Sequence, residues 1–169
     1  MLAHGTDTKL TKAQQKCKLL IMTSNITHKA TVNFYKQNNH FGFAPESFLF
    51  FPQAALPALD HDGKVIMKSA CEVQLSPNGN GALFQAIQEN AQVKKVIQST
   101  QYVQVIGVDN VMNKLLDPMH IGFTASRGLE ASLKCCVKRS PDEKVGVVLV
   151  KNGKYDIIEY SEIPVELTE

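Results

Sequence analysis

Hydrophobic and polar residues alternate along this chain in two different periods, which predict strands and helices in turn. Residues 18–24 form a short apolar run that ends in small hydroxyl side chains, as a buried parallel strand does. Apolar residues then recur every four positions over residues 26–37 and predict an amphipathic helix, with Asn25 or Thr27 as its cap. Residues 47–51 predict a second buried strand, which ends at a proline because proline donates no hydrogen bond to a sheet.

The same pattern continues through the second half of the chain. Residues 102–108 form the strongest candidate for a central strand, and residues 131–137 predict another. Helices are expected from Ala82 and over residues 93–99. A further helix is expected to begin at Asp117-Pro118, an N-cap followed by proline, and to stop at a glycine, Gly128.

Turn signals in the sequence also predict antiparallel strands. A turn at residues 60–63 leads into short strands at 65–67 and 71–75, and Asn-Gly within residues 146–159 is a strong hairpin signal. Strands that alternate with helices predict one α/β layer fold, with a mostly parallel mixed sheet between helices and a β-hairpin addition. A chain of 169 residues is long enough to bury one core.

The candidate chemistry lies where predicted strands end. The glycine-rich turn at residues 76–81 opens a helix, so it either binds phosphate at the helix start or is a turn that binds nothing. Gln53 follows a strand at the edge where α/β sheets bind ligands, or is a solvated loop residue. Asp109 follows another strand and either holds Mg²⁺ against phosphates or, with Asn110, caps the next helical turn. The polar run at 159–162 closes the hairpin or is an exposed strand end.

Composition and charge narrow the possible functions. A net charge of +2, with scattered basic residues, argues against a nucleic-acid surface. No apolar run is long enough to cross a membrane and the N-terminus lacks a signal peptide's apolar region, so a cytoplasmic protein is expected. The four cysteines lack metal-ligand spacing and are expected to be buried and reduced. P-loop, dinucleotide and Ser-His-Asp patterns are absent from the sequence.

Several short motifs occur in a characteristic order, and together they resemble one family. They are Met22-Thr23-Ser24, Phe50-Phe51-Pro52-Gln53, Asp62-Gly63-Lys64, Ser76-Pro77-Asn78-Gly79-Asn80-Gly81, Val108-Asp109-Asn110, Asp117-Pro118, Ile121-Gly122-Phe123, Val145-Gly146-Val147-Val148 and Glu159-Tyr160-Ser161-Glu162. This set resembles the eukaryotic-type UDP-N-acetylglucosamine pyrophosphorylases, which are uridylyltransferases. The resemblance covers residues 18–164.

The resemblance implies a nucleotide-diphosphosugar transferase-like (Rossmann-like) α/β fold and a transfer reaction. UTP and N-acetylglucosamine 1-phosphate would give UDP-N-acetylglucosamine and pyrophosphate, with Mg²⁺ as cofactor and without nucleic-acid or membrane partners. The choice between N-acetylglucosamine and N-acetylgalactosamine stays open. Nucleotide contacts fall by resemblance to Gln53, Gly79 and Asp109, with Asp109 also as the Mg²⁺ ligand, and sugar contacts fall to Asn80, Glu159 and Tyr160.

One family motif has no match in this sequence. A glycine-rich GGxGTRLG loop, which holds the UTP phosphates in the family, is expected upstream of residue 18 and is not found there. We therefore divide the chain into a lead-in segment at 1–17, a partial catalytic domain at 18–164 and a tail at 165–169. The chain is expected to be inactive alone; the alternative is a non-catalytic paralogue that binds uridine nucleotide or UDP-sugar.

Overall fold

The computed structural model describes residues 16–140 and 143–163. Most of the expected lead-in segment and the whole tail at 165–169 lie outside these residues. The chain forms two compact units, Met1–Val103 and Gln104–Glu169, and each is described by itself. The division into a lead-in, a partial domain and a tail stays a prediction.

The first unit is built on a parallel pair of strands, β1 (Leu19–Thr23) and β2 (Phe48–Pro52). Leu19 pairs with Phe48 and Thr23 with Pro52, so the two carboxyl ends meet at one edge. The predicted strands at 18–24 and 47–51 are thereby confirmed. The proline is the last residue of β2 and ends it, as expected.

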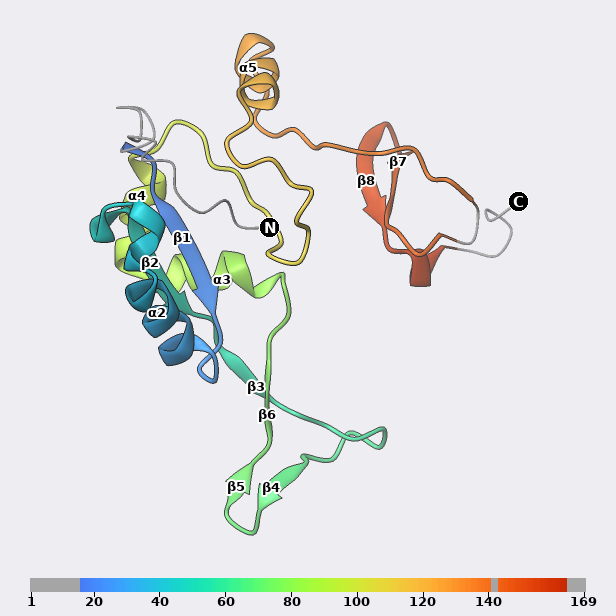
Figure 1. The fold of residues 1–169 in the computed structure, drawn as a ribbon. Helices are drawn as coiled ribbons and strands as arrows, with labels where there is room; N and C mark the ends of the chain where they lie inside the picture. The colour runs from blue at the N-terminus through green and yellow to red at the C-terminus, as the bar shows by residue number, and fades with distance from the viewer. Residues whose placement is uncertain (1–15, 141–142, 164–169) are drawn as a thin grey trace. The chain divides into compact units, whose positions relative to one another are not determined.

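Helices cover both faces of this pair (Figure 1). One face carries α2 (His28–Gln37), whose Tyr35 ring packs against the Phe48 and Phe50 rings of β2, with centroids 5.1 Å apart in each pair. The other face holds the buried cluster of Phe51, Ala86 and Val93, to which α3 (Ala82–Glu89) and α4 (Ala91–Gln98) contribute. Successive strand residues point to opposite faces, so β2 supplies both layers.

Short 3-10 turns and caps connect these elements. The turns η1 (Asn39–Gly42) and η2 (Pro45–Ser47) link α2 to β2. Thr27 occupies the N-cap position of α2, but its hydroxyl accepts from the Ser24 amide at 3.1 Å rather than from the helix. The Asn90 side chain caps α4 by accepting from Gln92 and Val93 amides, each at 3.1 Å.

Antiparallel pairs extend from this layer (Figure 1). Strand β3 (Ala55–Pro57) pairs with β6 (Leu75–Pro77), and β4 (Met67–Ser69) pairs with β5 (Glu72–Val73). The predicted strand at 71–75 is therefore split between two partners. The split occurs at Gln74, whose amide donates to Ile66 while its carbonyl accepts from Ala58.

The second unit contains helix α5 (Pro118–Ser126) and a hairpin of β7 (Val147–Lys151) and β8 (Lys154–Ile158), followed by the turn η3 (Tyr160–Glu162). The hairpin turn has positive φ at Asn152 and Gly153, as a type I′ turn requires. Helix α5 ends in two bonds of a Schellman motif, from Gly128 N to Ala125 O and from Leu129 N to Thr124 O, both 3.1 Å. Both local predictions are confirmed.

Two strand predictions in this part of the chain are wrong. Residues 102–108 and 131–137 are irregular, and Val103, Val105 and Val108 are exposed. A strand needs a neighbour to accept and donate its ladder hydrogen bonds, and neither segment pairs with another within the described residues. The parallel sheet is therefore smaller than expected. Among residues 16–140 and 143–163, β1–β2 is the one parallel pair.

The cysteine prediction also needs correction. Cys71, Cys135 and Cys136 are exposed rather than buried, and Cys17 is half-buried. Cys71, Cys135 and Cys136 form no disulfide. Cys135 and Cys136 are exposed because residues 131–137 form no strand in a sheet that would bury them. Cys71 is exposed because it lies in the turn between β4 and β5.

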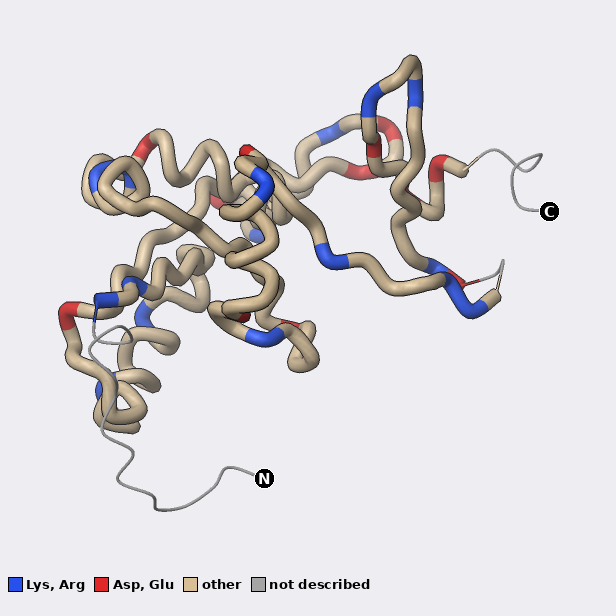
Figure 2. The backbone as a smooth tube through the Cα atoms, turned by 90° about the horizontal axis from the view of Figure 1, so that it is seen from above, with Lys and Arg blue, Asp and Glu red and all other residues tan. Residues whose placement is uncertain are grey.

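Charge and hydropathy of the described residues agree with the sequence pattern. Figure 2 shows Lys and Arg positions spread along both units rather than gathered on one element. Among the residues that the structure describes, no helix is both long and apolar enough to cross a membrane.

Candidate functional site

A small open pocket lies at the carboxyl ends of β1 and β2. Three segments line it: residues 24–26 after β1, residues 53–55 after β2, and residues 75–77 of β6. Its volume is about 70 Å³, well below the roughly 300–1,000 Å³ of a complete small-molecule site. It therefore has room for one ring or head group of a larger ligand. The carboxyl edge of parallel strands is where α/β sheets bind ligands.

Gln53 is held in this pocket by its backbone. Its amide donates to the Thr23 carbonyl at 2.7 Å, which continues the β1–β2 pairing by one step beyond the last paired residues. Thr23 is itself buried, and its hydroxyl lies 2.8 Å from His28 Nδ1 and 3.3 Å from the Phe51 carbonyl. The backbone of Gln53 is thus held by Thr23, which in turn contacts β2 and the start of α2.

The side-chain oxygen of Gln53 has an unusual environment. Its Oε1 is buried and has no hydrogen-bond partner among the described residues. A buried acceptor without a partner costs about 1–3 kcal/mol, and such groups are rare enough to need an explanation. Gln53 lines the pocket, so a turn of its side chain toward the pocket would let this oxygen accept from a ligand donor.

The glycine-rich turn follows β6 and opens α3. Gly79 has a φ of +76°, and its carbonyl accepts from the Ala82 amide at 3.2 Å. The amides of Leu83 and Phe84 donate in the same way to residues 80 and 81. These three amides are therefore used within the turn, and the first interpretation, a phosphate site at the helix start, stays a prediction. Asn80 is exposed beside them.

We expect Gly79→Ala to destabilise the turn by about 1 kcal/mol, because a positive φ strains an L-residue. An added Cβ would meet nothing within 4 Å at Gly79 or at Gly81, so crowding does not contribute at either position. Gly81 has a φ of −63°, which an L-residue adopts without strain, and Gly81→Ala is the matched control. The less flexible unfolded chain offsets the poorer N-cap, so the change should stay within about 0.5 kcal/mol. Urea unfolding of both variants measures the difference. Equal losses of unfolding free energy in the two variants would show that the positive φ of Gly79 does not cause the destabilisation.

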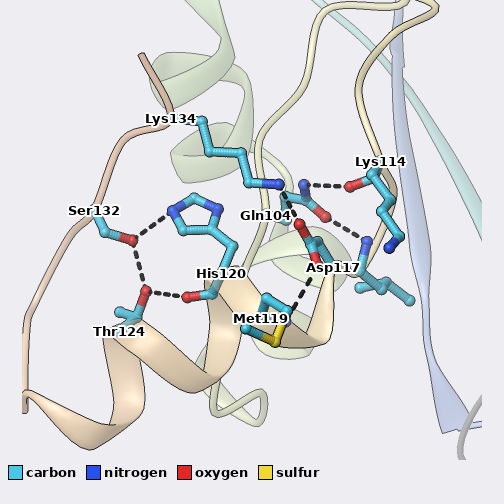
Figure 3. Close-up of polar contacts among 9 residues, drawn as sticks. Gln104, Lys114, Asp117, Met119, His120, Thr124, Ser132 and Lys134 are labelled. Carbon is cyan, nitrogen blue, oxygen red and sulfur yellow. Dashed lines mark hydrogen bonds and ion pairs between the residues drawn. The ribbon is translucent and has the colours of Figure 1, made fainter. Parts of the chain in front are cut away.

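In the second unit, polar contacts converge on the start of α5 (Figure 3). The Asp117 side chain caps the helix by accepting from the Met119 amide at 3.1 Å and forms an ion pair with Lys134. The Lys134 hydrogen bond is the main cause that lowers the pKa of Asp117, and the charge of Lys114 lowers it further. Asp117 is buried, so this ion pair fixes the irregular segment at 131–137 to the helix.

A second contact links the same segment to α5 one turn further along. Ser132 Oγ lies 2.8 Å from His120 Nε2 and 2.6 Å from Thr124 Oγ1. Thr124 Oγ1 also donates to the His120 carbonyl at 2.9 Å. Figure 3 shows these three side chains facing one another. Their hydrogen bonds are used to hold the segment to the helix.

Gln104 closes the loop that carries Asp109. Its Oε1 accepts from the Leu116 amide at 2.6 Å and its Nε2 donates to the Lys114 carbonyl at 3.1 Å, so one side chain pairs with the far end of the loop (Figure 3). Within the loop, Asn110 accepts from the Met112 amide at 3.2 Å. Asn110 thus stabilises a turn rather than the expected helical turn, because residues 111–116 form no helix, and the Asp109 carboxylate is exposed.

We expect α5 to lose stability in acid through Asp117. The pKa of Asp117 is lowered from its ordinary value of 3.8, so its contribution is complete above pH 3.8 and is lost as pH falls through the lowered value. Asp117→Asn keeps a capping oxygen and loses the charge, so hydrogen exchange of α5 amides should become faster at neutral pH and less dependent on pH in acid. Glu130→Gln, at an exposed position in the same unit, is the control. An unchanged acid profile in Asp117→Asn would contradict the role of this pair.

The structure brings some of the sequence-predicted residues together and leaves others within a different unit. Gln53 lines the pocket, and Gly79 and Asn80 follow the β6 residues that line it. Asp109, Glu159 and Tyr160 belong to the second unit and are exposed there. Glu159 stands immediately before η3, where its carbonyl accepts from the Glu162 amide at 2.9 Å. The roles of all six stay predictions.

Sequence reasoning missed the residues that brace the second unit. Gln104 bonds to Leu116, 12 positions away, and Lys134 bonds to Asp117, 17 positions away. Neither residue lies in a periodic or capping pattern. Asp117 was found only as a local cap. No short-range signal marks its long-range partner.

Known proteins are similar to this chain in sequence. A UDP-N-acetylglucosamine pyrophosphorylase of Saccharomyces cerevisiae is 42% identical over 151 residues, which are 88% of this chain and 32% of that protein. A UDP-N-acetylhexosamine pyrophosphorylase-like protein 1 of Xenopus tropicalis is 37% identical over 150 residues, covering 88% of this chain and 29% of that protein. The chain thus spans about a third of the length of these curated relatives.

Solved structures resemble the fold over nearly the same stretch. A chain from Trypanosoma brucei, a uridine diphosphate N-acetylglucosamine pyrophosphorylase in complex with an inhibitor, superposes with a TM-score of 0.75 at 32% identity, over 86% of this chain and 30% of that one. A chain from Entamoeba histolytica, described as the same kind of enzyme, gives a TM-score of 0.82 at 30% identity, over 89% of this chain and 38% of that one. The predicted α/β fold class is therefore confirmed.

The fold and the sequence similarities both point to one enzyme family. The UTP–glucose-1-phosphate uridylyltransferase family matches residues 3–169, and the chain belongs to that family.

Proposed function

We propose that this chain is the uridine- and sugar-recognising part of a UDP-N-acetylglucosamine pyrophosphorylase. The reaction is UTP plus N-acetylglucosamine 1-phosphate giving UDP-N-acetylglucosamine plus pyrophosphate. The observation that carries the proposal is the buried, unpartnered Oε1 of Gln53, a residue that lines the pocket at the β1–β2 edge. The names of the S. cerevisiae and T. brucei relatives support the choice of reaction.

Uracil suits the chemistry of Gln53. An amide offers both a donor and an acceptor, and uracil presents an N–H beside carbonyl oxygens. The Gln53 oxygen lacks a donor among the described residues, and the uracil N–H would supply one. Gly79, which has no side chain, would let the backbone approach the base.

Sugar recognition is assigned by family resemblance to residues of both units. Asn80 is exposed after the positive-φ glycine, where its amide is free to bind a hydroxyl or the acetamido group. Glu159 and Tyr160 are exposed at the end of the hairpin, where their oxygens are free to bind sugar hydroxyls. Preference for N-acetylglucosamine over N-acetylgalactosamine would depend on these contacts.

Asp109 fits a modest role toward Mg²⁺. No group of three or more His, Cys, Asp or Glu residues gathers as a metal site within the described part of the chain. Mg²⁺ is usually held by one or two carboxylates together with phosphates and water, so the exposed Asp109 carboxylate is a sufficient protein ligand. When bound, the ion would neutralise charge on the phosphates.

Turnover needs more than recognition. In this transfer the sugar phosphate oxygen attacks the α-phosphorus of UTP and pyrophosphate leaves, so catalysis consists mainly of positioning and charge neutralisation. The sequence contains no GGxGTRLG segment to hold the phosphates. We therefore propose that the 169-residue chain binds uridine ligands without measurable turnover.

Ligand-dependent thermal stability of the full chain tests this function. UDP-N-acetylglucosamine and UTP should raise the melting temperature in a saturable way, and CTP at the same concentrations should not, because cytosine presents an acceptor where uracil presents an N–H. Equal shifts with CTP, or none with either uridine ligand, would overturn the proposal. Pyrophosphate release from UTP and the sugar phosphate would contradict the absence of turnover alone.

The alternative is a non-catalytic paralogue that binds uridine nucleotide or UDP-sugar. It makes the same binding prediction, and it is separated from the first proposal by the activity of the complete protein that contains this chain.

We also propose a cytoplasmic location. The exposed thiols of Cys71, Cys135 and Cys136, none in a disulfide, suit a reducing compartment.

A further inference from the structure

Cys135 and Cys136 form an exposed pair of neighbouring thiols in the second unit. They lie in the irregular segment that follows Lys134, and both are exposed. A strand here would point the two side chains to opposite faces. The segment is irregular and pairs with no strand among the described residues, so no sheet ladder fixes the directions of the two side chains.

Two adjacent thiols can bind one soft atom at the same time. Neighbouring Cα atoms are about 3.8 Å apart, so two thiol side chains that turn to the same side reach a common centre. A structural zinc site needs four protein ligands, and no cluster of three or more ligating side chains occurs in the described residues. The pair therefore suits a centre that needs only two sulfurs from the protein.

We propose that Cys135 and Cys136 are a dithiol site for small trivalent arsenicals, bound through both sulfurs. An organoarsenic(III) oxide, R–As=O, reacts with the two thiols to form two As–S bonds. The As=O oxygen leaves as water with both thiol protons, and arsenic stays trivalent, so no oxidant is needed. The site is independent of the proposed uridylyl transfer.

Cys71 provides a matched comparison within the same chain. It is also exposed, but it stands alone in the turn between β4 and β5. One thiol forms one As–S bond, whereas the second thiol of the pair attacks within the same molecule. Such an intramolecular second contact strengthens binding by about 10²–10⁴-fold.

Titration of the reduced full chain with phenylarsine oxide, followed by intact mass spectrometry, tests the site. We expect one tightly bound arsenical per chain, two thiols lost per arsenical, and peptide mapping to residues 135–136. Bound arsenic should resist excess glutathione and be released by 2,3-dimercaptopropanol. Cys135→Ser and Cys136→Ser should each weaken binding by about 10²–10⁴-fold, and Cys71→Ser should leave it unchanged.

Each other outcome would overturn the site. Retained affinity in either serine variant, a loss of affinity in Cys71→Ser, or release by glutathione would show single-thiol binding. Reaction only after denaturation in urea would show that the pair is not accessible in the native chain. Because the thiols are adjacent in sequence, a variant that folds poorly still reports the stoichiometry.

Discussion

Gln53→Met is expected to make the protein more stable and its uridine recognition weaker. The variant removes a buried carbonyl oxygen that has no hydrogen-bond partner among the described residues. Such a group costs about 1–3 kcal/mol, and methionine has a similar shape without the polar atoms. We expect a gain of about 1 kcal/mol in the free energy of unfolding without ligand.

The same change should weaken binding of UDP-N-acetylglucosamine. Loss of two net hydrogen bonds to uracil, each about 0.5–1.5 kcal/mol, corresponds to a roughly 5- to 150-fold weaker Kd. Isothermal titration gives the Kd, and urea unfolding without ligand gives the stability. The opposite signs of the two effects distinguish a ligand-binding acceptor from a packing residue, which would lose both or neither.

Gln92→Met is the control for this experiment. Gln92 is an exposed glutamine on α4, so the same substitution removes no buried acceptor. We expect both its stability and its Kd to stay near those of the parent chain. A Gln53→Met variant that binds as well as the parent would remove Gln53 from the site, even if its stability rises.

Local sequence signals predicted local structure well. Asp117-Pro118 and Gly128 placed the two ends of α5, because capping and a positive φ depend on neighbours within one turn. The Asn152-Gly153 turn was found for the same reason. The β1 and β2 runs were also found, and they placed Gln53 at the carboxyl edge of the sheet before any contact was known.

Predictions that depended on distant partners were less successful. Residues 102–108 have the composition of a central strand, yet strand formation requires a neighbouring ladder that composition does not specify. The braces made by Gln104 and Lys134 join segments that are far apart in sequence. The unpartnered state of Gln53 Oε1 likewise depends on everything packed around it, so only the structure could reveal it.

Phe51→Ala should have the largest effect on stability. Phe51 is 1% exposed and, with Ala86 and Val93, forms the buried cluster of the first unit. Truncating a buried phenylalanine costs about 3–5 kcal/mol through lost burial and the cavity that remains. Native domains are stable by only about 5–15 kcal/mol, so this one change should remove much of the stability of the β1–β2 layer.

Phe84→Ala is the matched control, because Phe84 lies on α3 of the same unit and is 70% exposed. Its truncation removes little buried surface, so we expect a cost below about 1 kcal/mol. Urea midpoints of the two variants, read by circular dichroism, give the comparison. A similar cost for both would mean that the cluster around Phe51 is not the core of this unit. The Thr23 contact is kept in Phe51→Ala, because Thr23 donates to the backbone carbonyl of residue 51, so the measured cost reports the buried ring alone.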